Sequence, residues 1–288
     1  MGETMRNSAR IATAAAAGLA AVGGTVALGS WTWNRATTRL VARLKEAEPL
    51  CAPELSVLDF SRLEGLPPPV ARYFAFALSP GQRIIASAHL RFTGTFAAGP
   101  NAWAAFTAEQ DVRVTPPGFV WDARIAMIPV VPVRVRDSYV GGEGAMRAAA
   151  AGVIPVVDQH GTPEMAAASL QRFLAEAVWL PTALLPREGL SWSAIDDTSA
   201  RVTLTDGPTT VSLDVTFGPR GEVESTSTMR YRDVKGTPVL TPWVGHHRDY
   251  ERIAEMMIPT SGDVAWILPD GPQPYWRGRL VSATFDWR

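Results

Sequence analysis

The sequence predicts a mainly β fold of the α+β class, in which an antiparallel sheet curls into a half-barrel and one helix covers it. Three observations predict this fold. Segments in which apolar and polar side chains alternate follow one another from residue 84 to the C-terminus, turns rich in glycine and proline separate them, and one segment inserted between them has helical periodicity instead. A β-sandwich is the alternative architecture.

The inserted helix is expected at residues 163–179. Its apolar side chains repeat at the spacing of one helical face, and they are Leu170, Phe173, Leu174, Ala177 and Val178. Thr162 can cap the first turn, and Pro181 ends the helix because a proline disfavours helical angles in the residue before it. The side chains assigned to the opposite, polar face are Gln171, Arg172 and Glu176. A shorter helix is expected at 68–76, ahead of the strands.

Two groups of strands flank the inserted helix, and the short turns within each group predict antiparallel hairpins. The expected strands are 84–96, 102–114, 119–128, 131–140 and 144–150 before the helix, and 190–195, 200–205, 209–217, 222–231, 249–253, 263–267 and 274–287 after it. In 209–217 the alternation leaves one face apolar and the other polar. A twisted sheet of about ten strands with one apolar face has to curl or be covered, which favours a half-barrel.

Composition assigns the chain to the ordinary globular class. Of its 288 residues, 47% are hydrophobic and 19% are charged. The net charge of −1 argues against general nucleic-acid binding, which requires an excess of Lys and Arg. Cys51 is the only cysteine, which excludes an intrachain disulfide and a cysteine-rich zinc site. We expect no nucleic-acid partner and no cofactor.

The N-terminus has the pattern of a membrane anchor or of a cleaved signal peptide. Arg6 and Arg10 precede an uncharged run at 11–30, whose length favours a single-pass anchor, and Trp31 follows where a membrane interface would lie. The basic residues after the run favour a cytoplasmic domain, whereas the short basic start is typical of exported chains, and we expect the extracytoplasmic side. The chain then divides into an anchor or signal segment (1–30), a juxtamembrane spacer (31–64) and a single β domain (65–288).

Charged side chains share one face of the predicted hairpin at 119–140. If its two strands pair, Asp122, Arg124, Arg134 and Arg136 lie on the same side of the sheet. One interpretation is a ladder of cross-strand ion pairs on a solvated face. The other is a ligand site, in which Arg134 and Arg136 beside Arg124 hold a phosphate or carboxylate head group whose tail enters the apolar interior.

Tryptophan is abundant, with ten residues in the chain. We expect Trp121, Trp179 and Trp276 to line the interior, because a curled sheet that its own side chains cannot fill leaves a pocket for an aliphatic ligand. Glu176 and Trp179 lie where the helix, the kink at Pro181 and the sheet should meet. A pocket is therefore expected beside these two residues.

The sequence contains no recognisable catalytic motif, neither a Gly-x-Ser-x-Gly elbow nor a P-loop nor HExxH, so no catalytic residue is assigned. The adjacent His246 and His247 point apart in any regular element and lack a nearby third ligand, so no metal site is predicted. A carboxylate such as Glu109 or Glu176 could still serve as a general acid or base. An enzyme of the cell envelope is therefore an alternative function.

Several ordered motifs resemble an uncharacterised bacterial family. They are GLPPPVARY, which begins at Gly65, then FVWDARI, PVRVRDSYV, LAEAVWLPTALLP, the Asp206-Gly207 turn and the terminal YWRGRL. From about residue 65 to the C-terminus the chain resembles the domain-of-unknown-function families numbered 6544 or 6920, and this resemblance implies no particular activity. The predicted half-barrel also resembles those of periplasmic lipoprotein carriers, at the level of fold alone.

These observations favour a membrane-tethered module that binds an apolar or lipid-like ligand between its sheet and its helix. The alternatives are the envelope enzyme and a scaffold domain that binds other proteins. The interior of the half-barrel distinguishes these functions. A filled core argues against a ligand held there, whereas a pocket with two converging acids favours an enzyme.

Overall fold

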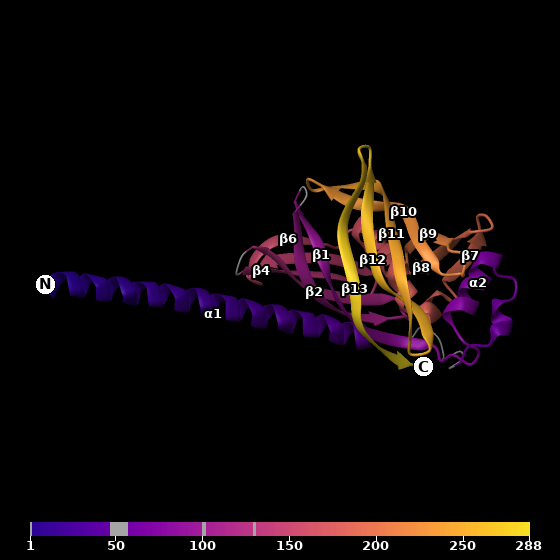
Figure 1. The fold of residues 1–288 in the computed structure, drawn as a ribbon, viewed down its shortest axis with the longest axis horizontal. Helices are drawn as coiled ribbons and strands as arrows, with labels where there is room; N and C mark the ends of the chain where they lie inside the picture. Colours follow the sequence, from indigo (N-terminus) through magenta and orange to yellow (C-terminus); the bar gives the residue numbers. More distant parts are fainter. Residues whose placement is uncertain (1, 47–56, 100–101, 129–130) are drawn as a thin grey trace.

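The structure, a computed structural model, describes residues 2–46, 57–99, 102–128 and 131–288, with side chains from residue 23 onward except at positions 62, 128 and 131. One antiparallel sheet of thirteen strands dominates it (Figure 1). The strands are β1 (Ile85–Gly99), β2 (Ala102–Arg113), β3 (Gly118–Ile128), β4 (Val131–Val140), β5 (Glu143–Ala150), β6 (Ile154–His160), β7 (Leu190–Ala194), β8 (Ser199–Asp206), β9 (Thr209–Phe217), β10 (Val223–Val234), β11 (Thr237–Ile253), β12 (Met256–Leu268) and β13 (Gly271–Trp287).

The sheet is a meander in which the first and the last strand of the sequence lie side by side in the middle. Each strand pairs with its neighbour in sequence, except that β6 and β7 form the two edges and β1 pairs with β13. The two predicted groups of hairpins are therefore the two halves of one curled, unclosed sheet, which confirms the half-barrel. Because all thirteen strands belong to a single sheet, the β-sandwich alternative is wrong.

Helix α3 (Pro163–Glu176) lies inside the curl and contacts both halves, at β4 and β5 and at β9 and β10. It begins as predicted, because the hydroxyl of Thr162 accepts a hydrogen bond from the amide of Met165 at 3.2 Å. Two short 3₁₀ turns continue it, η2 (Ala177–Trp179) and η3 (Pro181–Leu184). At the other side of α3, Gly144 of β5 makes a close approach, since a Cβ on it would lie 2.4 Å from the carbonyl oxygen of Met165.

The hydrophobic core lies between α3 and the inner face of the sheet, and helix α2 (Pro68–Ala77) extends it at one end. Tyr73 and Phe74 of α2 are fully buried, and the Tyr73 ring lies 5.8 Å from that of Phe217. A short 3₁₀ turn, η1 (Phe60–Leu63), precedes α2. We call this end of the half-barrel the closed end, because α2 and η3 pack there. Figure 1 shows α2 and the C-terminus on the same side of the sheet.

The opposite end, which we call the hairpin rim, is where β1 and β3 end and β2 and β4 begin, and it carries the turns that join β5 to β6, β10 to β11 and β12 to β13. The strands from β10 to β13 are longer than the alternation predicts, and their hairpins project at this rim (Figure 1). Prolines and Gly245 interrupt the alternation in β11 although its ladder continues through them. The sequence also missed β6, an edge strand that pairs only with β5.

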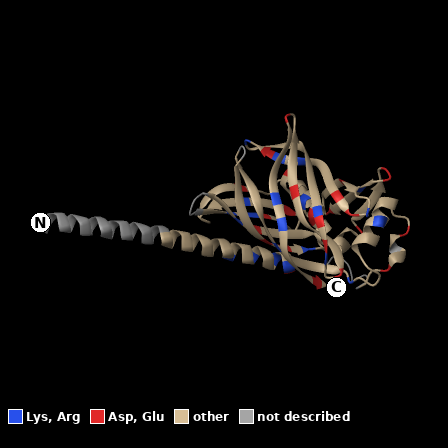
Figure 2. Ribbon diagram, viewed as in Figure 1, with Lys and Arg blue, Asp and Glu red and all other residues tan. Residues whose placement is uncertain are grey.

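Helix α1 (Gly2–Glu46) is continuous and docks on the outer face of the sheet with its C-terminal part. Leu44 packs with Val120 of β3 and Val140 of β4 in a second, small apolar cluster. In the part of α1 whose side chains are described, Lys and Arg residues lie toward this docked end, with Arg43 and Lys45 in the last turn (Figure 2). Residues 31–46, expected as part of a spacer, thus contact the domain itself. Across the helices whose side chains are described, no stretch has the length and hydropathy of a membrane span, and the side chains of the N-terminal half of the run at 11–30 lie outside that description.

Candidate functional site

The structure divides the predicted ligand residues between the two faces of the sheet. Four of them lie on the inner side with α3, and these are Trp121, Glu176, Trp179 and Trp276. The other three lie on the outer face beneath or beside α1, and these are Arg124, Arg134 and Arg136. The reason is the alternation of β3 and β4, since neighbouring residues of a strand point to opposite faces. A ligand held against Trp121 would therefore not reach the Arg134 guanidinium, and the predicted combination of head-group arginines with an apolar interior is not formed.

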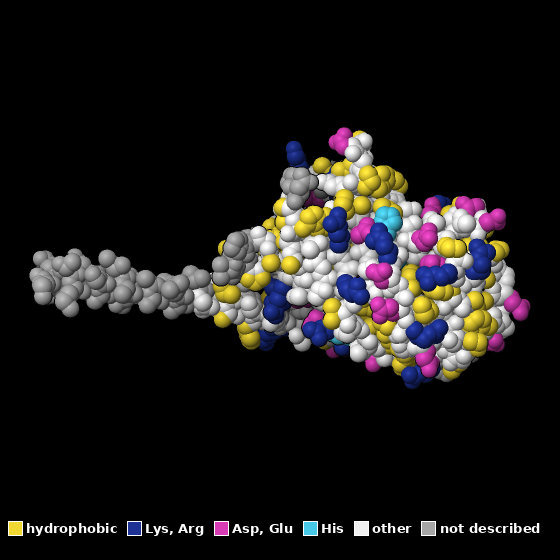
Figure 3. Space-filling model, in the orientation of Figure 1, with side chains coloured by type: hydrophobic (Ala, Val, Ile, Leu, Met, Phe, Trp, Pro, Cys, Tyr) yellow, Lys and Arg dark blue, Asp and Glu magenta, His cyan; other side chains and the backbone are white. Residues whose placement is uncertain are grey.

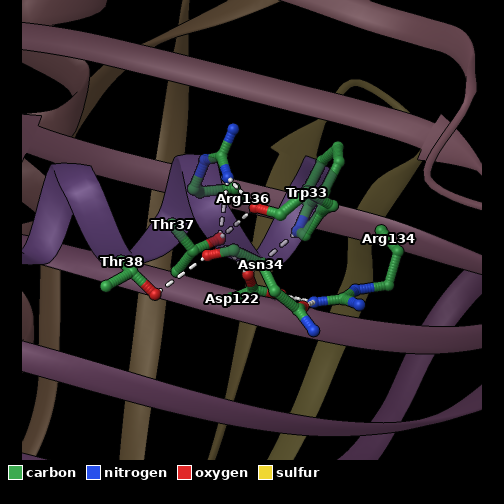
Figure 4. A network of polar contacts seen from close by, with 7 residues as sticks. All are labelled: Trp33, Asn34, Thr37, Thr38, Asp122, Arg134 and Arg136. Carbon is green, nitrogen blue, oxygen red and sulfur yellow. Dashed lines mark hydrogen bonds and ion pairs between the residues drawn. The ribbon is translucent and has the colours of Figure 1, made fainter. Parts of the chain in front are cut away.

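On the outer face, three of the four predicted charged residues, Asp122, Arg134 and Arg136, form a network with α1 (Figure 4). Arg136 is opposite Asp122 in the register of β3 and β4, and Arg134 is opposite Arg124. The Asp122 carboxylate accepts hydrogen bonds from Arg134 at 2.9 Å and from the indole of Trp33 at 2.9 Å. The four charges do share one face, as expected, but α1 covers Arg134 and Arg136, where a solvated face was one interpretation.

Both arginines of this network are buried, and within the described part of the chain Asp122 is the carboxylate that faces them. Arg136 donates to the hydroxyl of Thr37 at 2.7 Å and to the carbonyl oxygen of Trp33 at 3.3 Å, and its guanidinium lies 4.6 Å from the centre of the Trp33 ring. Burial lowers the pKa of Arg136, partly opposed by the charge of Asp122. The charge of Arg136 is thus stabilised by α1, through the carbonyl oxygen and the ring of Trp33 and the hydroxyl of Thr37.

A groove of about 510 Å³ lies between α1 and the outer face of β1, β2, β3 and β13. Its lining combines hydroxyl groups and balanced charges with apolar residues: Thr37, Thr38, Thr93 and Thr107, the cations Arg91, Arg124 and Arg134, the anions Glu109, Asp111 and Asp122, and the apolar Val41, Phe92, Ala108, Val120 and Val281. Arg91 and Glu109, the latter a predicted general acid or base, form a pair at 4.0 Å in which both side chains are exposed. The groove is large enough for a small ligand, but its lining is not that of an apolar ligand site.

Inside the half-barrel, Arg172 of α3 joins two carboxylates. It binds Asp137 of β4 at 2.6 Å and Glu176 at 2.8 Å, and Glu176 also accepts from Gln110 at 2.7 Å. The Arg172 guanidinium lies 4.9 Å from the centre of the Trp121 ring. Burial acts to lower the pKa of Arg172, but the charges of Glu176 and Asp137 outweigh it and raise the pKa above its ordinary value.

Gln171, Arg172 and Glu176, which the spacing assigns to the polar face of the helix, all make contacts inside the half-barrel. The sheet curls around α3, so both sides of the helix meet strands, and Gln171 reaches the carbonyl oxygen of Met229 at 2.9 Å on the far half. The hollow beside Glu176 has a volume of about 10 Å³, room for one water molecule at most. The pocket expected beside Glu176 and Trp179 is therefore filled, and the two carboxylates converge on Arg172 instead of on open space.

Trp179 and Trp276 occupy neighbouring parts of the inner face. The Trp179 indole donates to the carbonyl oxygen of Pro259 at 3.0 Å and its ring lies 4.9 Å from that of Phe92. Trp276 stacks on Phe106, with the ring centres 5.9 Å apart. These contacts confirm that both tryptophans belong to the interior.

Toward the hairpin rim the inner face carries a half-buried aromatic wall that the sequence did not predict. Its rings are Phe96, Trp266, Tyr275 and Trp276, all packed against the core. A β-bulge leaves Tyr275 unpaired between residues that pair with Val264 and Ala265, so that Tyr275 turns inward together with its neighbour Trp276. Strict alternation would have placed these two rings on opposite faces.

Two arginines of β10 flank this wall. Arg230 donates to the Tyr275 hydroxyl at 3.2 Å, and its guanidinium lies 5.9 Å from the centre of the Trp266 ring. Arg232 lies at the same distance from Trp266, and its Nε is buried without a hydrogen-bond partner among the described residues. We call these six residues, Phe96, Arg230, Arg232, Trp266, Tyr275 and Trp276, the rim wall. The alternation in 222–231 could have indicated which face of the sheet Arg230 lies on.

The paired histidines of β11 point to opposite faces, as expected. His246 contacts Asp263 at 3.0 Å on the outer side, whereas His247 faces Trp179, with the ring centres 6.3 Å apart. Burial lowers the pKa of His247 to about 3. Among the side chains that the structure describes, no three His, Cys, Asp or Glu residues are grouped as metal ligands.

Comparisons with known proteins place the β domain in a family. Residues 64–285 match the family of unknown function DUF6920. A LolA superfamily protein from Nitrosomonas europaea is similar in structure, with a TM-score of 0.36 and 11% identity over 76% of this chain and 92% of that one. A β-barrel-like protein of the unknown-function family DUF1849 from Brucella abortus gives a TM-score of 0.28 and 9% identity over 70% and 99%. No match was found among curated proteins.

Proposed function

The chain belongs to DUF6920, a family of unknown function, and we propose that it is a membrane-tethered binding module that holds an apolar or lipid-like ligand on the rim wall. The observation that supports this proposal is that the wall combines half-buried aromatic rings with Arg232, whose Nε has no hydrogen-bond partner among the residues that the structure describes. Aromatic rings offer apolar area to a hydrocarbon chain. The guanidinium of Arg232 offers a fork of donors to a carboxylate or phosphate.

The rim wall takes over the role that the sequence gave to Arg134 and Arg136. These two arginines lie beneath α1 on the outer face, whereas Arg230 and Arg232 lie on the same face as Trp276. Arg230 is already bonded to the carbonyl oxygen of Ala168 and to Tyr275. Arg232 is therefore the head-group residue of the proposal, with Trp276 as a wall for the chain.

The interior limits where the ligand lies. Helix α3 and its ionic cluster occupy the middle of the half-barrel, and the hollow beside Glu176 is too small for a hydrocarbon chain. The proposed ligand therefore rests on the inner face near the hairpin rim and does not pass through the core. The tether is the uncharged run at 11–30, which lies in α1.

The test is ligand binding by the full chain. Purified protein is extracted with organic solvent and the extract is examined for lipid by mass spectrometry, and the delipidated protein is titrated with a fluorescent fatty acid. We expect co-purified lipid and saturable binding. Replacing Trp276 with alanine should weaken binding of the fatty acid and of the corresponding fatty alcohol alike, because both contain the chain.

The substitution Arg232→Gln tests the contribution of the ligand's head group independently of its hydrocarbon chain. It should weaken the fatty acid about tenfold, the magnitude of one charge-assisted bond, while the alcohol changes little. The matched control is Arg277→Gln, since Arg277 lies on the outer face over Trp103 at 4.1 Å. Absence of lipid in the extract together with no saturable binding would rule the proposal out, as would equal losses for Arg232→Gln and Arg277→Gln.

A further inference from the structure

Exposed hydrophobic side chains are concentrated at the hairpin rim. Among the described residues, all exposed large hydrophobics except Val57, Ile195 and Val281 lie at this rim or on α1 beside it. They are Leu28, Trp31, Met127, Val153, Ile154, Val156, Met229, Val234, Val239, Leu240 and Ile267. Figure 3 shows hydrophobic side chains gathered at the projecting hairpins and beside the emerging helix. Exposed apolar side chains grouped at one end of a domain mark an interaction surface, whereas single exposed residues do not.

Helix α1 leaves the domain at the same rim. Its C-terminal end lies near the closed end, where Leu44 approaches Gly118, and it crosses the β5–β6 turn at Gly29. A Cβ on Gly29 would lie 2.7 Å from the carbonyl oxygen of Ala151, so the helix and the turn are in contact there. Beyond Gly29 the helix projects away from the sheet for roughly 40 Å, at 1.5 Å per residue (Figure 1).

The chemistry of the projecting segment identifies the partner. The uncharged run at 11–30 begins just beyond the rim, and the exposed Trp31 lies at its end, in the position that tryptophan favours at a membrane interface. If this run enters a bilayer, the surface of that bilayer meets the domain at the crossing of α1 and the β5–β6 turn. The two halves of the rim then face the lipid.

We infer that the hairpin rim is a lipid-docking surface. The rim lies against the bilayer, so the closed end of the half-barrel points away from it. The two contact regions are Val153 and Ile154 beside α1, and Val239, Leu240 and Ile267 at the long hairpins. Each region carries apolar side chains that would enter the interfacial zone of a bilayer. The inference rests on the membrane tether of the proposed function and not on its ligand.

Site-specific labelling of the full chain tests this surface. With Cys51 replaced by serine, a single cysteine is introduced at Leu240, at Ile154 or at Ile195 and labelled with the environment-sensitive fluorophore NBD. Ile195 is the matched control. Its exposed fraction, 48%, is close to the 49% of Leu240, but Ile195 lies at the closed end. Each protein is reconstituted into vesicles of phosphatidylcholine and phosphatidylglycerol, with or without nitroxide-bearing lipid.

Docking requires blue-shifted emission and nitroxide quenching at both 240 and 154, with neither at 195. Silence at 240, or a response at 154 alone, overturns the docking of the rim, since contact would then be confined to the neighbourhood of α1. Flotation of the same samples shows whether the chain binds vesicles at all, and failure there overturns the tether and the inference together. Rim contact without fatty-acid binding would leave the inference in place and remove the proposed ligand.

Discussion

The indole of Trp33 donates a hydrogen bond to the carboxylate of Asp122 at 2.9 Å, joining α1 to a strand 89 residues further along the chain. The same carboxylate accepts from Thr37 and from Arg134. One acidic side chain therefore binds the helix and also compensates the buried cations beneath it. Figure 4 shows these contacts between α1 and the outer face of the sheet. We expect the docking of α1 to depend on them.

Replacing Asp122 with alanine should loosen α1. The change removes three hydrogen bonds and leaves Arg134 and Arg136 buried without a carboxylate. A loss of about 1.5 kcal/mol or more should speed amide hydrogen exchange in residues 31–46 about tenfold. Asp158→Ala is the control, since Asp158 pairs with Arg147 where both side chains are half-exposed. Unchanged exchange in α1 would show that the apolar contacts of Leu44 suffice for docking.

Replacing Arg172 with methionine should destabilise the domain strongly. Asp137 and Glu176 would then be buried without their shared cation, and breaking such a network costs about 3–5 kcal/mol. Urea denaturation measures the free energy of unfolding. Arg201→Met removes the Arg201–Asp214 pair on an exposed hairpin and should cost less than about 1 kcal/mol. Equal losses in the two variants would contradict the interior role of Arg172.

The free energy of unfolding should decrease as the pH is lowered, partly because of His247. Burial lowers the pKa of its ring to about 3 in the native state, against about 6.5 in an unfolded chain. Its contribution is complete above pH 6.5 and is lost as the pH falls toward 3, because only the unfolded chain then takes up a proton. At pH 5 the loss is at most roughly 2 kcal/mol.

His247→Phe should therefore flatten the decline in the free energy of unfolding between pH 7 and pH 4. His160→Phe is the comparison, since its side chain is 58% exposed on β6. That variant should leave the slope of stability against pH unchanged. A His247→Phe protein with the wild-type slope would assign the acid sensitivity to other groups.

Replacing Gly278 with alanine should displace Trp276 from the rim wall. The added Cβ would lie 2.1 Å from Cζ2 of the indole, so the ring has to move. We expect a shift in tryptophan emission and a destabilisation of about 1–3 kcal/mol. In a Trp276→Leu background the same change should cost much less, and the double-mutant cycle measures the difference. Additive effects would mean that Gly278 is constrained by something other than this ring.

The local elements and the fold class follow from patterns in the sequence. Helix α3 was predicted from its apolar spacing, the Thr162 cap and Pro181, all of which act within a few residues. Alternation likewise predicted that Asp122, Arg124, Arg134 and Arg136 share one face of the sheet, since a strand sends successive side chains to opposite sides. A β-rich chain with one apolar face then has few solutions besides curling.

Only the tertiary structure decided what each face meets. Spacing assigned Arg172 to the polar face of its helix but not to a partner, and the sheet that curls around α3 brings Asp137 of β4 to that face. Arg134 and Arg136 looked accessible until α1 covered them from about 100 residues away in sequence. The rim wall depends on a bulge at Tyr275 and on pairing between β1 and β13, the two ends of the domain. Spacing within a segment reports which side chains share a face, whereas long-range packing decides whether that face meets water, a helix or a ligand.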